Sequence, residues 1–150
     1  MSSSYMANYY EIASVKMKVY TEDVIDLDRF MLFKAEPFID PAMNVAITKT
    51  NDIIPRGRVL SHLKNVTVME MPNGKQGVVF FSEDGSPIAY LETDNGWQNV
   101  EIKYKIFSYI KNYSITDILI GSAFKNIIVH NGGLVVHSSA IYYSGIGVAF

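Results

Sequence analysis

The chain has 150 residues, of which 49% are hydrophobic and 19% are charged, and this balance favours a folded globular chain over a disordered one. Its net charge is −2, and no run of like charges predicts a nucleic-acid arm or a polybasic membrane patch. There is no cysteine, which excludes disulfides and thiolate metal sites. Neither a signal peptide nor a membrane span of roughly 18 apolar residues can be recognised. We therefore expect a cytoplasmic protein.

The first candidate strand lies near the N-terminus. Residues 9–20 alternate in their second half, with Val15, Met17 and Val19 on one side and lysines on the other. Such alternation is typical of a half-buried strand. The alternation loses its register in the first half, so we expect a bulge or a break near residues 13–14.

A short helix is predicted from about Glu22 to Phe33. Apolar residues follow one another there at helical spacing: Val24, Leu27, Phe30 and Met31. The segment also carries three close aspartates: Asp23, Asp26 and Asp28. An EF-hand loop would need a glycine and a distal glutamate at set positions, and both are missing, so we interpret the aspartates as a solvated helix start.

A second strand is predicted at Met43–Thr48, which alternates again. Residues 51–58 contain a proline and a glycine and are expected to form a loop. Arg56 and Arg58 lie in this loop. The pair could bind an anion, but a solvated loop is the better interpretation.

Four strands in succession follow. They are joined by Asn-Gly or Asp-Gly turns about 11 residues apart, at Asn73-Gly74, Asp84-Gly85 and Asn95-Gly96. The expected strands are residues 66–71, 77–81, 87–92 and 97–104. Turns of this type close two-residue β-hairpins, so the segment predicts an antiparallel, up-and-down meander.

A long helix is predicted from Ser114 to Val129. Its expected buried face is formed by Ile115, Ile118, Leu119, Ser122, Ala123, Asn126 and Ile127. Asn131-Gly132 is a strong C-cap signal. Beyond it, two apolar runs joined by Ser144-Gly145 predict a C-terminal β-hairpin.

The predicted fold class is therefore α+β. It combines a mostly antiparallel sheet, a short N-terminal helix, one long helix near 114–129 and a C-terminal hairpin. We expect a β-rich accessory region at residues 1–112 and a second unit at residues 113–150, which begins with the long helix.

The segment after the long helix resembles a known family. It reads Gly-Gly-Leu-Val-Val-His-Ser-Ser-Ala-Ile at residues 132–141 and Gly-Ile-Gly-Val-Ala-Phe at residues 145–150. This pattern is similar to the segment just before the phosphate-binding loop of HPr kinase-like proteins, which are phosphoenolpyruvate-carboxykinase-type kinases with many bacterial members. The specific match covers roughly the last thirty residues, and the preceding part is similar only in layout.

The resemblance implies an ATP- and magnesium-dependent kinase that phosphorylates a hydroxyl, such as that of a serine, in full-length relatives. This sequence departs from the family pattern because it contains no Gly-x-x-x-x-Gly-Lys-Ser/Thr loop. We therefore expect a chain that stops just before this loop, is catalytically inactive alone and holds no cofactor or metal of its own.

His137 and Ser138 are the site residues that the resemblance suggests, since the histidine at the end of this strand lies beside the phosphate-binding loop in the family. The other interpretation is a core histidine bonded between strands, with Ser138 and Ser139 as small residues that allow close packing. No Gly-x-Ser-x-Gly elbow activates either serine.

The histidines and the aromatic pairs give only weak indications of a binding site. The three histidines, His62, His130 and His137, show no zinc-binding spacing, and a helix C-terminus explains His130. The aromatic pairs at residues 9–10, 80–81 and 142–143 could stack bases. A basic groove is missing from the sequence pattern, so strand faces and core are the better interpretation, and no nucleic-acid or membrane partner is expected.

Three functional hypotheses remain open. The first is the non-catalytic N-terminal part of an HPr kinase-like protein. The second is an interaction or dimerisation module, in which the strand at residues 146–150 pairs with a second copy or with a separately encoded kinase half. The third is an unrelated β-rich binding domain.

Overall fold

The computed structural model describes residues 6–22, 28–105, 109–110, 113–133, 135, 140–143 and 146–149. The first elements are β1 (Met6–Ile12), β2 (Val15–Thr21), the 3-10 helix η1 (Asp28–Phe33), β3 (Met43–Lys49) and β4 (Arg58–Leu63). The meander follows as β5 (Val66–Glu70), β6 (Gln76–Phe81), β7 (Pro87–Thr93) and β8 (Asn99–Tyr104). The remaining elements are β9 (Tyr109–Ile110), β10 (Tyr113–Ser114), α1 (Ile115–His130), β11 (Ala140–Tyr143) and β12 (Ile146–Ala149).

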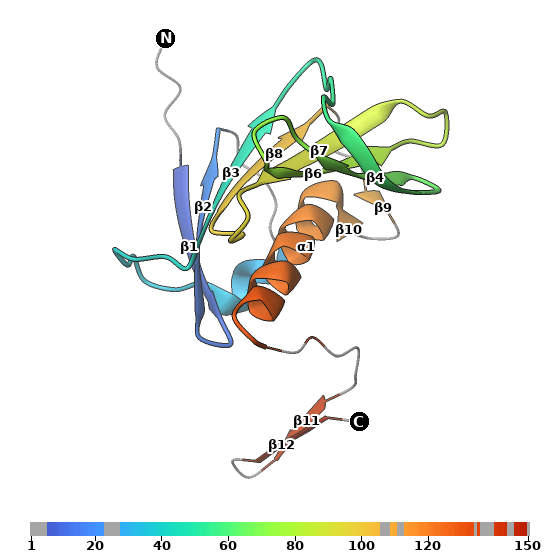
Figure 1. Ribbon diagram of the computed structural model, residues 1–150. Coiled ribbons are helices and arrows are strands. Elements are labelled where there is room, and N and C mark those ends of the chain that lie inside the picture. Colours follow the sequence, from blue (N-terminus) through green and yellow to red (C-terminus); the bar gives the residue numbers. More distant parts are fainter. Residues whose placement is uncertain are drawn as a thin grey trace.

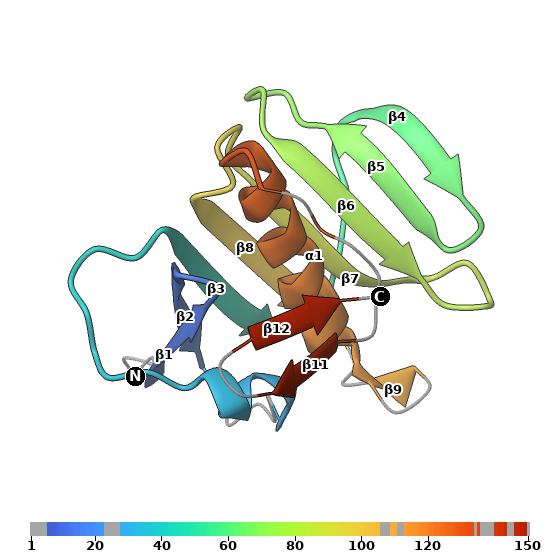
Figure 2. The same ribbon diagram turned by 90° about the horizontal axis from the view of Figure 1, so that it is seen from below.

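An eight-stranded sheet dominates the fold, in the order β1-β2-β3-β8-β7-β6-β5-β4. Neighbouring strands are antiparallel except at β2–β3 and β3–β8, which pair in parallel. Figures 1 and 2 show that the sheet twists strongly, with β1 and β4 at opposite ends. The mostly antiparallel sheet expected from the sequence is confirmed, whereas the two parallel pairings were not predicted.

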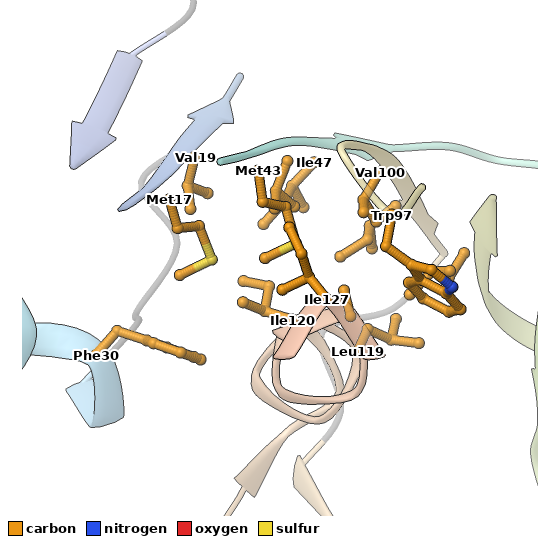
Figure 3. Close-up of a cluster of buried hydrophobic side chains, with 14 of the residues drawn as sticks. Met17, Val19, Phe30, Met43, Ile47, Trp97, Val100, Leu119, Ile120 and Ile127 are labelled. Atoms are coloured by element: carbon orange, nitrogen blue, oxygen red, sulfur yellow. The ribbon is translucent and has the colours of Figure 1, made fainter. Parts of the chain in front are cut away.

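Helix α1 packs across one face of this sheet, against β3 and β8 (Figure 1). Its fully buried side chains are Leu119, Ile120, Ala123 and Ile127. They meet Met17, Val19, Met43, Val45, Ile47, Val100 and Ile102 from the sheet, with Trp97 and Phe30 at the margins (Figure 3). Helix and sheet thus share one hydrophobic core.

The predicted meander is confirmed, because β5 to β8 follow the expected segments and pair in sequence as antiparallel neighbours. Its last strand is shorter than predicted, however. Trp97 lies in the preceding turn with φ 57°, and β8 begins at Asn99. The Asp94 carboxylate holds this turn, since it accepts bonds from the backbone N–H groups of Gln98 at 2.9 Å and Asn99 at 3.2 Å.

The N-terminal strand is two strands. Ala13 and Ser14 have φ values of 49° and 64°, which form a tight turn, and β1 and β2 pair antiparallel on either side of it. Two consecutive left-handed residues are the geometry of a two-residue hairpin turn, which usually contains glycine or asparagine. The expected break at residues 13–14 is therefore a complete reversal of the chain.

The short helix predicted from Glu22 is observed only as η1, from Asp28 to Phe33. Residues 23–27, including Asp23 and Asp26, lie outside the described residues. Phe30 is buried, and its ring packs on Tyr10 at a centroid distance of 5.8 Å. Met31 and Leu32, in contrast, are 53% and 91% exposed. A single anchoring aromatic suffices for so short an element.

Strand β4 was not predicted. The loop expected at residues 51–58 ends at residue 57, because Arg58 is already the first residue of β4. β4 forms one end of the sheet and pairs only with β5, with a bulge between Val59 and Ser61. All six of its residues are exposed. Its sequence does not alternate, because neither face of this strand lies over the core.

The long helix is confirmed within one residue at each end. Its buried face differs from the prediction at two positions, because Ile120 is fully buried and Asn126 is exposed. Ser122 is half-buried and donates from its hydroxyl to the Ile118 carbonyl at 2.8 Å. This bond satisfies the polar group within the helix.

The C-cap of α1 is also confirmed. Gly132 has φ 80°, its N–H donates to the Val129 carbonyl at 3.0 Å, and the Gly133 N–H donates to the Ile128 carbonyl at 2.8 Å. These two bonds define a Schellman motif. Left-handed backbone at this position favours glycine.

We expect Gly132→Ala to lower the free energy of unfolding by about 1 kcal/mol, because alanine is strained at positive φ. The matched control is Gly121→Ala in the same helix, where an added Cβ meets no atom within 4 Å. This control should raise the free energy of unfolding by about 0.5–1 kcal/mol through helix propensity. Urea denaturation measures both, and a shift of equal sign would contradict the Schellman geometry.

Candidate functional site

The sheet surface opposite α1, called here the outer face, carries the polar side chains that the core excludes. Strand register aligns them in rows across the sheet. One row contains Tyr20, Ala46, Glu101, Glu92 and Gly77, from β2, β3, β8, β7 and β6 respectively. The charged members of this row make it the strongest candidate for a functional surface among the described residues.

Glu92 is the centre of a hydrogen-bonded network. Its side chain is only 17% exposed. One carboxylate oxygen lies 3.0 Å from Lys75 Nζ, and the other accepts a 2.7 Å bond from the Tyr90 hydroxyl. The side chain of Asn73 also donates to this carboxylate. Glu92 is thus held in one orientation by two elements, β7 and the β5–β6 turn.

The network shifts the pKa values of Glu92, Lys75 and Tyr90. Partial burial alone would raise the pKa of Glu92, but the hydrogen bonds from Tyr90 and Lys75 outweigh burial and hold the pKa below its ordinary value. The same bond raises the pKa of Lys75. Burial, with the Glu92 charge nearby, raises the pKa of Tyr90. All three groups therefore keep their usual protonation at neutral pH.

Glu101 lies directly opposite Glu92 across the β7–β8 pair. Like charges in this position repel. The repulsion is offset because Glu101 lies 3.0 Å from Lys103, while Glu92 is bonded to Lys75. The four charges cancel, so this part of the outer face is neutral overall.

Gly77 allows Tyr90 to reach this network. A Cβ at Gly77 would lie 3.2 Å from Tyr90 Cε2 and 3.1 Å from Met71 Sδ, which is closer than such contacts normally come. The ring of Tyr90 therefore lies over the glycine. Tyr90 is also part of a small outer-face cluster with Ile53, Met69 and Val79.

A shallow hollow lies beside Glu92, and we call it the outer hollow. It has a volume of about 300 Å³ and is lined by Tyr20, Asn44, Ala46, Thr48, Lys75, Glu92, Asn99, Val100 and Glu101. A pocket of this size, lined by converging polar groups, is the default binding-site hypothesis for an uncharacterised fold.

A second hollow lies on the other side of Glu92, beneath the loop before β4. Asp52, Arg56, Lys103 and the apolar side chains of Ile53 and Met71 are among its lining residues. Ile53 is buried and closes the small outer-face cluster from above. This hollow carries two charges of each sign once Glu92 is counted, so it does not favour an anion.

The arrangement is suited to binding. The carboxylates, lysines and tyrosine are bonded to one another. No group of three histidine, aspartate or glutamate side chains that could hold a metal occurs among the described residues.

The site residues suggested by the resemblance are not placed. His137 and Ser138 lie outside the described residues, as does Ser139. His130 is the last residue of α1 and is exposed there. His62 lies on β4, with its Nδ1 2.7 Å from the Thr67 hydroxyl oxygen.

The arginine pair is divided by the structure. Arg58 bonds to Glu70 through Nε at 3.0 Å and Nη2 at 2.6 Å, so its charge is balanced within the β4–β5 pair. Arg56 instead lines the hollow beneath the loop. The two guanidinium groups therefore do not form one anion site.

The aromatic pair at residues 9–10 is also divided, since neighbours on a strand face opposite sides. Tyr10 is buried in the core, whereas Tyr9 lies on the outer face. There Lys18 lies above two rings, 5.3 Å from the Tyr9 centroid and 4.7 Å from the Tyr20 centroid. These contacts, and the packing of Tyr9 on Phe38, tie the rings to the protein surface.

The outer-face network was missed in the sequence. Glu92 and Glu101 each occupy polar positions of alternating strands, a signal that predicts only solvent exposure. Their juxtaposition depends on the β7–β8 register, and that register follows from the turn at Asp94. Turn length and alternation together could have placed these two carboxylates opposite each other.

Comparison of the chain with models of known protein families, with curated proteins and with solved structures found no match. Within the described part of the chain, no helix is both long and apolar enough to cross a membrane.

We expect Glu92→Gln to lower the free energy of unfolding by about 1–2 kcal/mol at neutral pH, because it weakens charge-assisted hydrogen bonds. The lowered pKa means that this stabilisation is present above the ordinary glutamate pKa of about 4.3 and is lost as the pH falls through the folded-state pKa. The difference between wild type and variant should therefore shrink in acid. Urea denaturation at several pH values measures it.

Glu101→Gln is the matched control, with the same charge change in the same row. Its side chain is 45% exposed and its ion pair with Lys103 is a surface pair, so the change should stay within about 0.5 kcal/mol. Equal losses in the two variants would contradict the central role of Glu92.

Proposed function

We propose that this chain is the non-catalytic N-terminal part of an HPr kinase-like, ATP-dependent protein kinase. The observation that carries the proposal is the sequence at residues 132–150, which resembles the segment before the phosphate-binding loop in that family. The order of elements supports it: a capped helix is followed by β11, which pairs antiparallel with β12. The two strands include residues 140–141 and 146–149 of the resembling segments.

On this proposal the sheet and α1 form the scaffold on which a kinase core is built. The extensive core beneath α1 gives the helix a fixed position, and the Schellman motif fixes where the chain leaves it. A rigid exit is what a segment feeding a phosphate-binding loop needs, because catalytic groups must be held within fractions of an ångström. ATP and Mg²⁺ would be bound only by residues that this sequence does not contain.

The experiment is isothermal titration calorimetry of this chain with ATP and Mg²⁺. The expected result is no binding in the micromolar range, because the sequence has no Gly-x-x-x-x-Gly-Lys-Ser/Thr loop to surround the phosphates. Micromolar affinity would contradict the proposal. A second arm fuses the chain to a phosphate-loop segment of an HPr kinase-like protein. Failure of this chimaera to bind ATP would also count against it.

A second candidate function, pairing of a β-strand with a second copy of this chain, is favoured by β4. The opposite end of the sheet is protected, since the Ala35 N–H donates to the Tyr9 carbonyl at 2.8 Å and Lys34 bridges to Tyr10. β4 has no neighbour on its outer side within the described chain. An open edge of this kind is a template for strand addition.

The side chains of β4 suit self-association. Val59, Leu60 and Leu63 are 56%, 50% and 67% exposed, so pairing would bury apolar surface. The charge of Arg58 is balanced by Glu70. Val59 and His62 both lie opposite outer-face residues of β5, so they share that face of the open edge.

We expect this chain to form a concentration-dependent dimer that Leu63→Lys weakens at least about tenfold, because the substitution places a charge in the paired edge. Light scattering over a concentration series measures the dimer. The matched control is Leu32→Lys, where leucine is 91% exposed on η1, and it should leave the dimer intact. A strict monomer at every concentration, or equal weakening by both variants, excludes pairing through β4.

A further inference from the structure

The outer hollow exists because a small residue stands between two large ones. Ala46 pairs with Tyr20 on one side and with Glu101 on the other, in one row across β2, β3 and β8. Its methyl group leaves a depression between the tyrosine ring and the carboxylate. The hollow is therefore a property of this row and persists without movement of the backbone.

Two polar groups in the hollow have no partner in the described part of the chain. The Asn44 amide and the Thr48 hydroxyl are half-buried, and neither side chain makes a hydrogen bond to a described residue. They flank Ala46 along β3, on the same face. Between them they offer two or more donors and several acceptor positions to a bound molecule.

The charged lining residues do not favour a charged ligand. Lys75 is bonded to Glu92 and Lys103 to Glu101, each at 3.0 Å. The carboxylates can still accept further bonds, because each oxygen has more than one acceptor position. A neutral molecule that can both donate and accept hydrogen bonds suits this lining best.

The Tyr20 ring supplies the apolar wall. Lys18 Nζ lies 4.7 Å from its centroid and covers one face of the ring, so the ring can offer only its other face to the hollow. A flat aromatic wall beside amide, hydroxyl and carboxylate groups matches a sugar ring, which has C–H groups on its faces and hydroxyls around its rim.

We propose that the outer hollow binds one saccharide unit. The Tyr20 ring packs on the face of the sugar, the Asn44 amide and the Thr48 hydroxyl bond to its hydroxyls, and Glu101 accepts from a further hydroxyl. The sheet supplies these groups already in place, so binding needs no rearrangement. Because the hollow is shallow and open, the affinity belongs in the millimolar range.

The experiment is a titration of isotope-labelled protein followed by NMR, with methyl glucoside, N-acetylglucosamine and maltose as separate probes. We expect saturating shifts of backbone resonances at residues 44–48 and 99–101 with at least one probe. Ala46→Tyr fills the hollow and should weaken these shifts at least about tenfold, as should Asn44→Ala. Ser61→Tyr, on exposed β4, is the matched control and should leave binding unchanged.

Three outcomes would overturn the proposal. The first is the absence of saturating shifts with all three sugars in a wild-type protein whose spectrum is well dispersed. The second is sugar-induced shifts that persist unchanged in Ala46→Tyr. The third is a stronger response of the same residues to adenosine or to sodium citrate than to any sugar, since these probes test for a stacked base and for an anion.

Discussion

The burial of one face of α1 against β3 and β8 is the interaction on which the rest of the structure depends. Leu119, Ile120 and Ile127 are each fully buried, and each contributes about 1.5–3 kcal/mol through loss of contact with water. The strands they cover come from distant parts of the sequence. Without the helix, the parallel pairing of β3 with β8 would leave an apolar sheet face in water, so the helix and the unusual strand order stabilise each other.

This arrangement separates the two faces of the sheet. The face under α1 takes most of the buried apolar side chains, and the outer face carries lysines, glutamates, asparagines and tyrosines beside the small cluster of Ile53, Met69 and Val79. Polar side chains gathered in this way must form hydrogen bonds with one another or with water. Around Glu92 they form a closed network, whereas Asn44 and Thr48 remain open to solvent.

Local signals predicted much of the fold. The turn residues at 73–74, 84–85 and 95–96 predicted the meander, and Asn131-Gly132 predicted the end of α1. Both signals are reliable because glycine and asparagine favour specific turn conformations of the backbone. The hairpin at Ala13 and Ser14 was missed since neither residue is typical of left-handed backbone. β4 was missed because an exposed edge needs no alternation, and the parallel pairs were missed because no local pattern encodes them.

The Glu92 network depends on cross-strand register, which the sequence indicates only indirectly, and His137 and Ser138 lie outside the described residues.

The strand order has a consequence for how the chain folds. β3 can pair with β8 only after β4 to β7, which lie between them in the sequence, have been synthesised. Pairing of such distant segments requires closure of a long loop, and the entropy lost in this step precedes the stabilising contacts, which slows folding. The hairpins from β4 to β8 can form locally and early, while the docking of β3 and α1 completes the core late. During synthesis, the apolar face of the meander is therefore exposed until the helix has emerged, and this interval is when the chain is most prone to aggregate.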